Sequence, residues 1–235
     1  RQRLCCGPEM RRGVPRVLPP LVAVVALYFA YSHRSSSSVA DATVQIDGLS
    51  FPPTIRIGNG ASLTFVGGGT RSKFSVVKVY AAALYLHDSG SASALKAFRK
   101  LGATDLRKKG EFFHALTSGR FQKALLLTFH RSVGAGAVAD ALKESLATRL
   151  SRSSLATFRE KLLQVLGENV PKGTELYFAC RSDALYLALG SPASTTAFHD
   201  KTICGALLDV YLGSSPISPA IKDGVADGFA ARMHA

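Results

Sequence analysis

Apolar and polar residues alternate through the first part of the chain's body, and this alternation predicts β-strands over about residues 43–86. Thr43–Ile46 alternates, and Thr54–Ile57 is a second short extended segment. Ala61–Val66 is expected to pair back as one arm of a hairpin. The longest predicted strand, about Lys73–Leu86, is rich in Val, Phe and Tyr. The body of the protein is therefore expected to begin as a sheet.

Further along the chain, the apolar residues recur at helical spacing. They predict amphipathic helices at Gly136–Leu150 and Ser153–Gly167, the second with a serine-rich N-cap region and Gly167 as its stop signal. The other elements expected are a basic helix at Ala92–Leu101, a connector through Phe112-Phe113, strands at Ala124–His130, Thr174–Cys180 and Ala184–Leu189, a helix at Thr196–Gly213 and a C-terminal helix after Pro219. Strands come early and helices late, which favours an α+β domain with helices packed on one face of a mainly antiparallel sheet.

The first 42 residues differ from this body and are predicted to be a targeting or membrane-anchor segment outside the fold. Arg11, Arg12 and Arg16 form a positive region, and the apolar run at residues 17–31 and a serine cluster follow it. At about 15 residues, the run is shorter than the roughly 20 that a membrane-spanning helix needs. Signal, membrane tether and organelle transit sequence remain open as alternatives. Met10 is the first candidate start residue, and residues 43–235 are expected to form one domain.

Charge and composition narrow the choice of partner. The chain carries 29 Lys and Arg against 16 Asp and Glu, a formal net charge of +13. Much of the excess lies in the N-terminal segment and in a basic stretch at Lys96–Lys123, which is interpreted as a solvated face or as a surface that attracts acidic ligands or anionic lipid. Because no recognisable nucleic-acid-binding module accompanies the charge, no nucleic-acid partner is expected. The oligomeric state is not predicted.

The cysteines and histidines give no sign of a metal site. The four cysteines form no C-x-x-C pair, and Cys180 and Cys204 are interpreted as two buried free thiols rather than a disulfide. The six histidines show no spacing typical of metal ligands. No cofactor is expected. Gly205 is expected to mark close helix packing.

The segment Thr64–His87 carries the candidate ligand chemistry. Its glycine run leads through Arg71 into the long apolar strand that holds Tyr80 and Tyr85. A cation and a phenol beside an apolar surface are what a pocket for an amphipathic ligand requires. The odd spacing of the two tyrosines places them on opposite faces of the strand. The glycines at 67–69 lack the pattern of a phosphate-binding loop and are interpreted as turn residues.

The same segment resembles the opening motif of the chalcone isomerase family, here G-x-G-x-R-x-K-F followed by K-V-Y-A-x-x-L-Y-L. Three further stretches resemble landmarks of that family in the same order: Phe51-Pro52-Pro53, Pro171-Lys172-Gly173-Thr174 and Ala206–Pro219. The resemblance implies an open-faced β-sandwich, a large antiparallel sheet covered by a helical layer. It also implies a plastid location, with a mitochondrion or a membrane anchor as the alternative.

The resemblance also indicates which residues could act. Of the donors that the family's enzymes use, only Arg71 is matched; Tyr80 stands where a Thr is expected. Ala137, Asp140 and Glu144 fall nearest the expected Tyr, Lys and Asn, and the hydroxyl position near Asp209-Val210 is apolar. Loss of one such donor typically costs about 10²–10³ in rate, so the pattern argues against chalcone cyclisation.

The fatty-acid-binding members of the family resemble this chain more closely, because they keep the Arg and place a Tyr in the strand. The resemblance therefore implies non-catalytic binding of a fatty acid or similar amphipathic carboxylate. Arg71 would grip the carboxylate, since a guanidinium matches its geometry, and Tyr80 would assist. The expected lining is Phe74, Val76, Leu84 and Phe129. The alternatives are a true isomerase, an intramolecular lyase, and a non-catalytic partner of the flavonoid pathway; haem held by a lone His such as His114 or His130 is a minor one.

Overall fold

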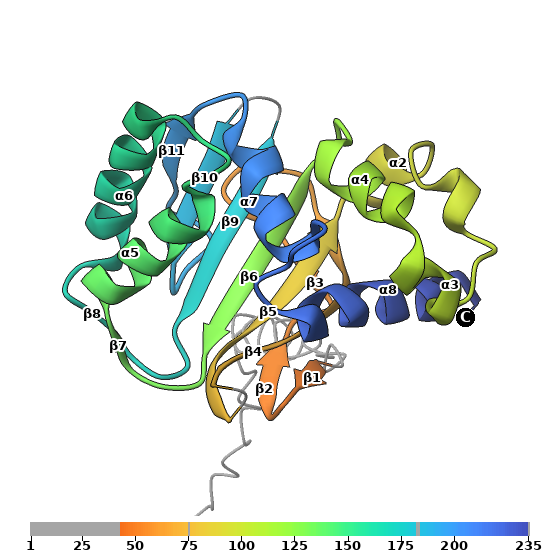
Figure 1. Cartoon of the computed structure of the whole chain (residues 1–235), viewed down its shortest axis with the longest axis horizontal. Coiled ribbons are helices and arrows are strands. Elements are labelled where there is room, and N and C mark those ends of the chain that lie inside the picture. The colour runs from red at the N-terminus through yellow and green to blue at the C-terminus, as the bar shows by residue number, and fades with distance from the viewer. Residues whose placement is uncertain (1–42, 75, 182–183, 235) are drawn as a thin grey trace, which may run out of the picture. The chain divides into compact units, whose positions relative to one another are not determined.

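The computed structural model describes residues 43–74, 76–181 and 184–234. Its main feature is a seven-stranded sheet in which every neighbouring pair of strands is antiparallel (Figure 1). In spatial order the strands are β11 (Thr196–His199), β10 (Ala184–Leu189), β9 (Glu175–Arg181), β6 (Lys123–Phe129), β5 (Val77–Leu86), β4 (Leu63–Lys73) and β3 (Thr54–Ile55). The predicted α+β class and the predicted large antiparallel sheet are confirmed.

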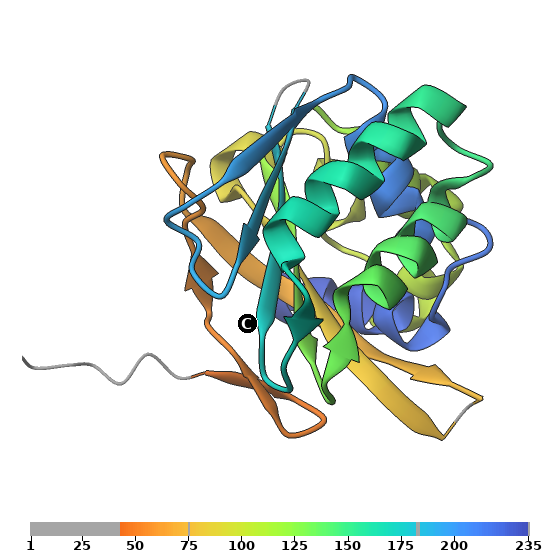
Figure 2. The same cartoon turned by 90° about the vertical axis from the view of Figure 1, so that its left-hand side faces the viewer.

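Helices cover one face of this sheet (Figure 2). They are α2 (Asp88–Ser91), the 3₁₀ turn η1 (Lys96–Phe98), α3 (Ala103–Lys108), α4 (Gly110–Ser118), α5 (Ala135–Leu146), α6 (Arg152–Leu166), α7 (Ile203–Leu212) and α8 (Pro219–His234). The predicted cap of α6 is confirmed: the Ser151 hydroxyl accepts a hydrogen bond from the Ser154 amide at 3.1 Å. Gly167 ends this helix with a φ of 69°, a conformation that glycine adopts without a steric cost.

Two hydrophobic cores lie on the two faces of the sheet. Tyr80, Leu84 and Phe129 belong to the core beneath the helices. Tyr85 belongs to the other, which the segment with β1 (Val44–Ile46) and β2 (Leu49–Phe51) covers. The Tyr85 hydroxyl donates to the carbonyl of Pro52 at 2.9 Å, which fastens this segment to the sheet. The prediction that Tyr80 and Tyr85 lie on opposite faces is therefore confirmed.

The glycines at 67–69 do not form a turn, and that interpretation is wrong. They lie inside β4, directly under α8. A Cβ atom at Gly67 would lie 2.1 Å from the carbonyl oxygen of Gly224, and one at Gly69 would lie 2.3 Å from that of Ala220. Side chains here would push the helix off the sheet, so the glycines serve close packing of α8 on β4.

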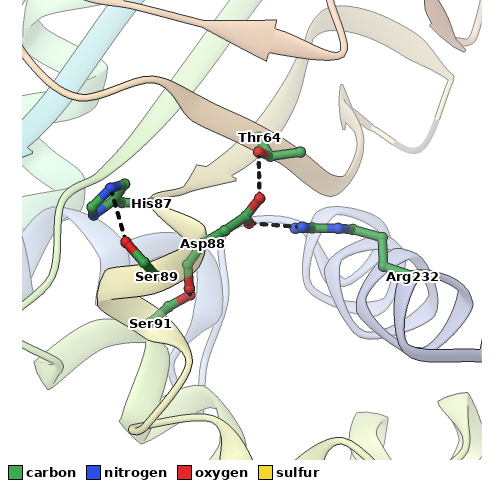
Figure 3. A network of polar contacts seen from close by, with 6 residues as sticks. All are labelled: Thr64, His87, Asp88, Ser89, Ser91 and Arg232. Carbon is green, nitrogen blue, oxygen red and sulfur yellow. Dashed lines mark hydrogen bonds and ion pairs between the residues drawn. The ribbon is translucent and has the colours of Figure 1, made fainter.

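Asp88, the first residue of α2, joins this helix to β4 and α8 (Figure 3). The Asp88 carboxylate accepts a hydrogen bond from the Thr64 hydroxyl of β4 at 2.8 Å and one from Arg232 of α8 at 2.7 Å. Burial acts to raise the pKa of Asp88, but the hydrogen bonds from Arg232 and Thr64 outweigh it and lower the pKa below its ordinary value. Asp88 is therefore ionised at neutral pH and links α8 to β4 and to the start of α2.

Three other predicted elements differ from the structure. The region predicted as a helix at Ala92–Leu101 contains only the short turn η1, and Phe112-Phe113 lies in α4 rather than in a connector. The predicted helix at Thr196–Gly213 is in fact a strand followed by a helix. Thr196–His199 pairs with β10, and α7 begins only at Ile203. The edge of β10 offers Thr196–His199 a backbone partner, and this tertiary pairing overrides the local helical pattern.

The two cysteines in the body form a disulfide, so their interpretation as free thiols is wrong. Cys180 is the penultimate residue of β9 and Cys204 lies in the first turn of α7, with 5.7 Å between their Cα atoms. That separation lies within the range that a disulfide spans. The bridge ties α7 to the sheet.

Several sequence predictions concern residues 1–42, which lie outside the described residues. Among the residues that the structure describes, no helix combines the length and the apolar character that a membrane crossing requires. Within the same residues, no cluster of three or more His, Cys, Asp or Glu side chains is arranged to hold a metal ion.

Candidate functional site

The hairpin of β4 and β5 brings the first two predicted site residues together. Arg71 and Tyr80 are directly opposed in the antiparallel register, so their side chains share one face of the sheet. A β-bulge between Arg71 and Ser72 shifts the register beyond this pair. The guanidinium carbon of Arg71 lies 5.6 Å from the centroid of the Tyr80 ring. Tyr80 is buried and Arg71 is half-buried, so the cation lies at the border between the apolar layer and solvent.

A second tyrosine, which the sequence analysis missed, completes the group. Tyr211 of α7 is fully buried, and its hydroxyl lies 3.1 Å from the hydroxyl of Tyr80. This phenol lies directly after Asp209-Val210, where the expected hydroxyl position was interpreted as apolar, and it places a hydroxyl of α7 beside Tyr80. The available signal was a phenol among the mainly apolar residues of α7.

Burial determines the protonation of both phenols. Burial raises the pKa of Tyr80. The charge of Arg71 and the hydrogen bonds from Tyr211 and Arg71 lower this pKa, but burial outweighs them. Burial also raises the pKa of Tyr211 well above its ordinary value, and the neighbouring Tyr80 adds to this shift. Both hydroxyls are therefore neutral at physiological pH and can donate hydrogen bonds. The group presents one fixed positive charge and two neutral donors.

Two of the predicted lining residues lie in the same layer as Tyr80. Phe129 of β6 is opposite Tyr80 in the register, and their rings meet edge to face with centroids 5.9 Å apart. Leu84 lies on the same face of β5, four residues further along. Both side chains are buried in the core beneath the helices.

The other two predicted lining residues do not belong to this layer. Phe74 and Val76 lie at the tip of the β4–β5 hairpin with 80% and 79% of their surface exposed. The sequence placed them in the long strand, but β4 extends to Lys73 and β5 begins only at Val77. The turn therefore falls on these residues and directs them to solvent, so they are removed from the lining.

Helix α5 supplies no polar donor to the layer around Tyr80 from the three positions singled out in the sequence. Ala137, Asp140 and Glu144 all lie on the exposed face of the helix. Asp140 forms an ion pair with Arg159 of α6 at 2.6 Å, which holds the two helices together at the surface. The buried face of α5 consists of apolar residues such as Leu142.

A separate cavity of about 770 Å³ lies at the far end of β5. It is lined partly by basic side chains, including His87, Arg120 and Lys201, and by the Cys180–Cys204 disulfide. From Tyr80 to the end of β5 is six residues, or roughly 20 Å at about 3.3 Å per residue. This cavity is therefore distinct from the group formed by Arg71, Tyr80 and Tyr211.

Fold and site together define an α+β domain in which a helical layer covers a large antiparallel sheet, with a cation and two phenols at one end of that layer. A family model described as chalcone isomerase-like matches residues 42–225 of the chain. The protein belongs to the chalcone isomerase-like family.

The similar proteins are of two kinds: chalcone–flavanone isomerases are similar in sequence, and a fatty-acid-binding protein is similar in structure. The chain is 25% identical to a chalcone–flavanone isomerase of Gentiana triflora, over 81% of this chain and 94% of the relative. It is 22% identical to that of Gossypium hirsutum, over 81% of this chain and 91% of the relative. Among solved structures, a fatty-acid-binding protein of Arabidopsis thaliana matches with a TM-score of 0.66 and 19% identity, over 83% of this chain and all of that one. This last likeness shows the fold.

Proposed function

We propose that this domain binds a fatty acid or a similar amphipathic carboxylate and does not catalyse ring closure. Arg71 holds the carboxylate, Tyr80 donates a hydrogen bond to it, and Tyr211 fixes the orientation of the Tyr80 hydroxyl. The observation that carries the proposal is the Arg71 guanidinium beside the buried, neutral Tyr80 ring, whose hydroxyl is paired with that of Tyr211, at the edge of an apolar layer. The fold shared with a fatty-acid-binding protein supports it.

The energetics of such a ligand assign different tasks to the tail and the head group. Burial of a twelve-carbon tail contributes roughly 0.8 kcal/mol per methylene, about 9 kcal/mol in all. The loss of translational and rotational freedom on association costs about 4–15 kcal/mol. Charge-assisted hydrogen bonds of about 1.5–3 kcal/mol each then decide whether binding is measurable. The tail supplies the driving force, and Arg71 selects a carboxylate.

The layer that would receive the tail is closed in this structure. Leu84 and Phe129 are 0% and 1% exposed, and Tyr211 of α7 packs against Tyr80. A tail that enters here has to separate side chains of α7 from those of β5. We therefore expect ligand binding to weaken the protection of α7 amides against hydrogen exchange relative to the free protein.

The first experiment compares binding in Arg71→Ala with that in the full-length parent protein. Displacement of a fluorescent fatty acid by laurate, together with native mass spectrometry, measures the affinity. Loss of the charge-assisted bonds should weaken binding about tenfold to a hundredfold. Tyr80→Phe removes a neutral donor and should weaken it by less, about two- to tenfold.

Arg120→Ala is the matched control, because it removes an equal charge from the lining of the distant cavity. It should leave the affinity unchanged. If Arg120→Ala abolishes binding and Arg71→Ala does not, the carboxylate binds in the other cavity and the assigned site is wrong. Equal affinity in all of these proteins would remove the head-group role altogether.

A true isomerase is the second candidate, and the named activity of the similar plant proteins favours it. The neutral phenols of Tyr80 and Tyr211 could polarise a ketone, as an oxyanion hole does. Against it, the three compared positions of α5 point to solvent. Flavanone formation clearly above the spontaneous rate, lost in Tyr80→Phe, would establish catalysis and overturn the non-catalytic proposal.

A further inference from the structure

The tip of the β4–β5 hairpin carries two apolar side chains in solvent. Phe74 and Val76 are 80% and 79% exposed. Among the residues that the structure describes, these two are the large hydrophobic residues whose side chains are exposed to solvent. Other bulky apolar side chains there are buried or partly buried in the two cores. Figure 2 shows this hairpin projecting beyond the neighbouring strands. Exposure of apolar surface at a projecting tip is typical of an interaction site.

The backbone at the tip presents the aromatic ring outward. Phe74 has a φ of 53°, in the left-handed region that bulky residues rarely adopt. A glycine or asparagine would occupy this turn position at lower cost. A phenylalanine held there at a cost in free energy, with its ring in water, indicates a role outside the fold.

Cations lie close to this apolar tip on the two strands of the hairpin. The ammonium group of Lys73 lies 5.4 Å from the centroid of the Phe74 ring. Arg71 lies two residues before Lys73 on the same strand, and Lys78 follows on β5. The Asp47 carboxylate lies 3.0 Å from the Lys78 ammonium, so this ion pair adds no net charge, and the positive charge of the hairpin comes from Lys73 and Arg71.

Further cations lie on the loops at the same end of the sheet. The His130 amide donates to the carbonyl of Val79, which places the loop after β6 beside the base of the hairpin. Arg131 in that loop and Lys172 in the loop before β9 are both exposed. The end of the sheet that bears the tip therefore carries an excess of positive charge.

We propose that this hairpin tip docks on an anionic lipid surface. Phe74 and Val76 insert at the level of the headgroups, and Lys73 and the neighbouring cations contact lipid phosphates. Apolar residues flanked by basic ones are typical of interfacial membrane contacts. Each Lys or Arg near an anionic surface strengthens the interaction by about fivefold.

A lipid surface fits this tip better than a protein partner does. A stable protein interface buries about 800 Å² on each partner with a packed apolar centre, whereas two side chains at the end of a narrow hairpin offer far less. Docking would also bring Arg71, three residues before Phe74, to the lipid surface. The docking inference rests on the exposed tip and its cations and does not depend on the proposed ligand.

The sequence allows a direct test because the chain contains no tryptophan. Phe74→Trp in the full-length protein places its single tryptophan at the tip, and excitation at about 295 nm avoids the tyrosines. Its emission is measured with vesicles of phosphatidylcholine alone and of phosphatidylcholine mixed with phosphatidylglycerol. His114→Trp is the matched control, since His114 is exposed on α4 at the other end of the sheet.

A tip that inserts should give a blue shift and protection from acrylamide for Phe74→Trp with the anionic vesicles only. His114→Trp should show neither change. Adding Lys73→Ala to Phe74→Trp should weaken vesicle binding by about fivefold, and higher salt should weaken it further.

Three results would overturn the proposal. The first is a protein that sediments with anionic vesicles while the emission of Phe74→Trp and of Val76→Trp stays unchanged, because another segment then makes the contact. The second is an equal shift on neutral vesicles, which removes the role of charge. The third is an equal shift of His114→Trp, which indicates a general loosening of the fold rather than docking of the tip.

Discussion

At the scale of single residues, Lys123 is an ammonium group in the interior of the domain. It is 3% exposed, and its Nζ donates to the carbonyl oxygens of Leu116 and Gly119 at 2.6 and 2.7 Å. These carbonyls end α4, so the side chain caps that helix. Burial lowers the pKa of Lys123 to about 8, whereas the carbonyl acceptors favour the charged form.

This lowered pKa predicts a pH dependence of the free energy of unfolding. In the unfolded chain a lysine titrates near 10.4, so above about pH 8 the unfolded state binds more protons than the folded state. Stability therefore rises with pH in this window. The contribution of Lys123 should increase by at most about 2 kcal/mol from about pH 7.5 to about pH 9.5.

Urea unfolding of the parent protein and of Lys123→Met at both pH values measures this contribution. The difference in free energy of unfolding between the two proteins should change in favour of the parent as the pH rises. Lys108→Met, which removes an exposed lysine, is the control. Its free energy of unfolding should change between the two pH values by the same amount as that of the parent. A parallel response of Lys123→Met would show that the pKa of Lys123 is not lowered.

Single residues also show what the sequence could and could not reveal about the site. Arg71 and Tyr80 were singled out because both lie in one continuous family-like motif. Their pairing across the hairpin was not predicted, because the turn near Phe74 was taken as part of the long strand. Tyr211 was not singled out, because only the packing of α7 on the sheet brings its hydroxyl to Tyr80. Phe74 was misplaced because a turn without glycine at its centre gives no break in an apolar strand pattern.

At the scale of elements, the contact between α8 and β4 depends on glycines in both. A Cβ atom at Gly224 of α8 would lie 1.9 Å from the carbonyl oxygen of Gly68. That oxygen belongs to β4, which is held in register by β5 along this stretch, so moving it aside would disturb the pairing of the two strands. We expect Gly224→Ala to lower the free energy of unfolding by about 1–3 kcal/mol, even though alanine favours the helix.

Gly205→Ala in α7 is the matched control for thermal or urea unfolding. A Cβ atom there meets nothing within 4 Å, so the sequence-based expectation of close packing at Gly205 is wrong. This substitution should raise the free energy of unfolding by up to about 1 kcal/mol. If both variants gain stability, α8 does not lie on β4 as closely as the structure indicates.

Elements with a continuous local pattern were predictable, and those that depend on a distant partner were not. Helices α5 and α6 repeat apolar residues along one face, and their positions were predicted to within a few residues. Strand β11 has no such pattern and exists because β10 offers it a free edge. The glycines of β4 suggested a turn because the reason for them lies in α8, some 150 residues later in the chain.

At the scale of the whole domain, α7 links the two ends of the sheet. Its first turn carries Cys204, which forms the disulfide with Cys180 in the lining of the 770 Å³ cavity. Its last turn carries Tyr211, whose hydroxyl is hydrogen-bonded to that of Tyr80. The ion pair of Arg149 with Asp209, 2.6 Å apart, holds the same helix to the segment after α5. The position of the site phenol thus depends on how firmly α7 is anchored to the sheet.

The disulfide should be the strongest of these anchors. It closes a loop of 24 residues that contains β10 and β11. Restriction of the unfolded chain by a loop of this size stabilises a folded protein by about 3 kcal/mol. We expect the double variant Cys180→Ser, Cys204→Ser to unfold at a correspondingly lower urea concentration, and reduction of the parent protein to have the same effect.

Urea unfolding with and without reductant distinguishes the stability that comes from the disulfide bond from the stability that comes from the packing of the two cysteine side chains. The parent protein should lose stability on reduction, whereas the double variant should be insensitive, because its body holds no other cysteine. Peptide mapping of the non-reduced parent should recover residues 180 and 204 in one linked fragment. Equal stability of the parent with and without reductant, together with unlinked fragments, would restore the interpretation of two buried thiols. Helix α7 would then be held to the sheet by packing and the Arg149–Asp209 ion pair, without a covalent bond.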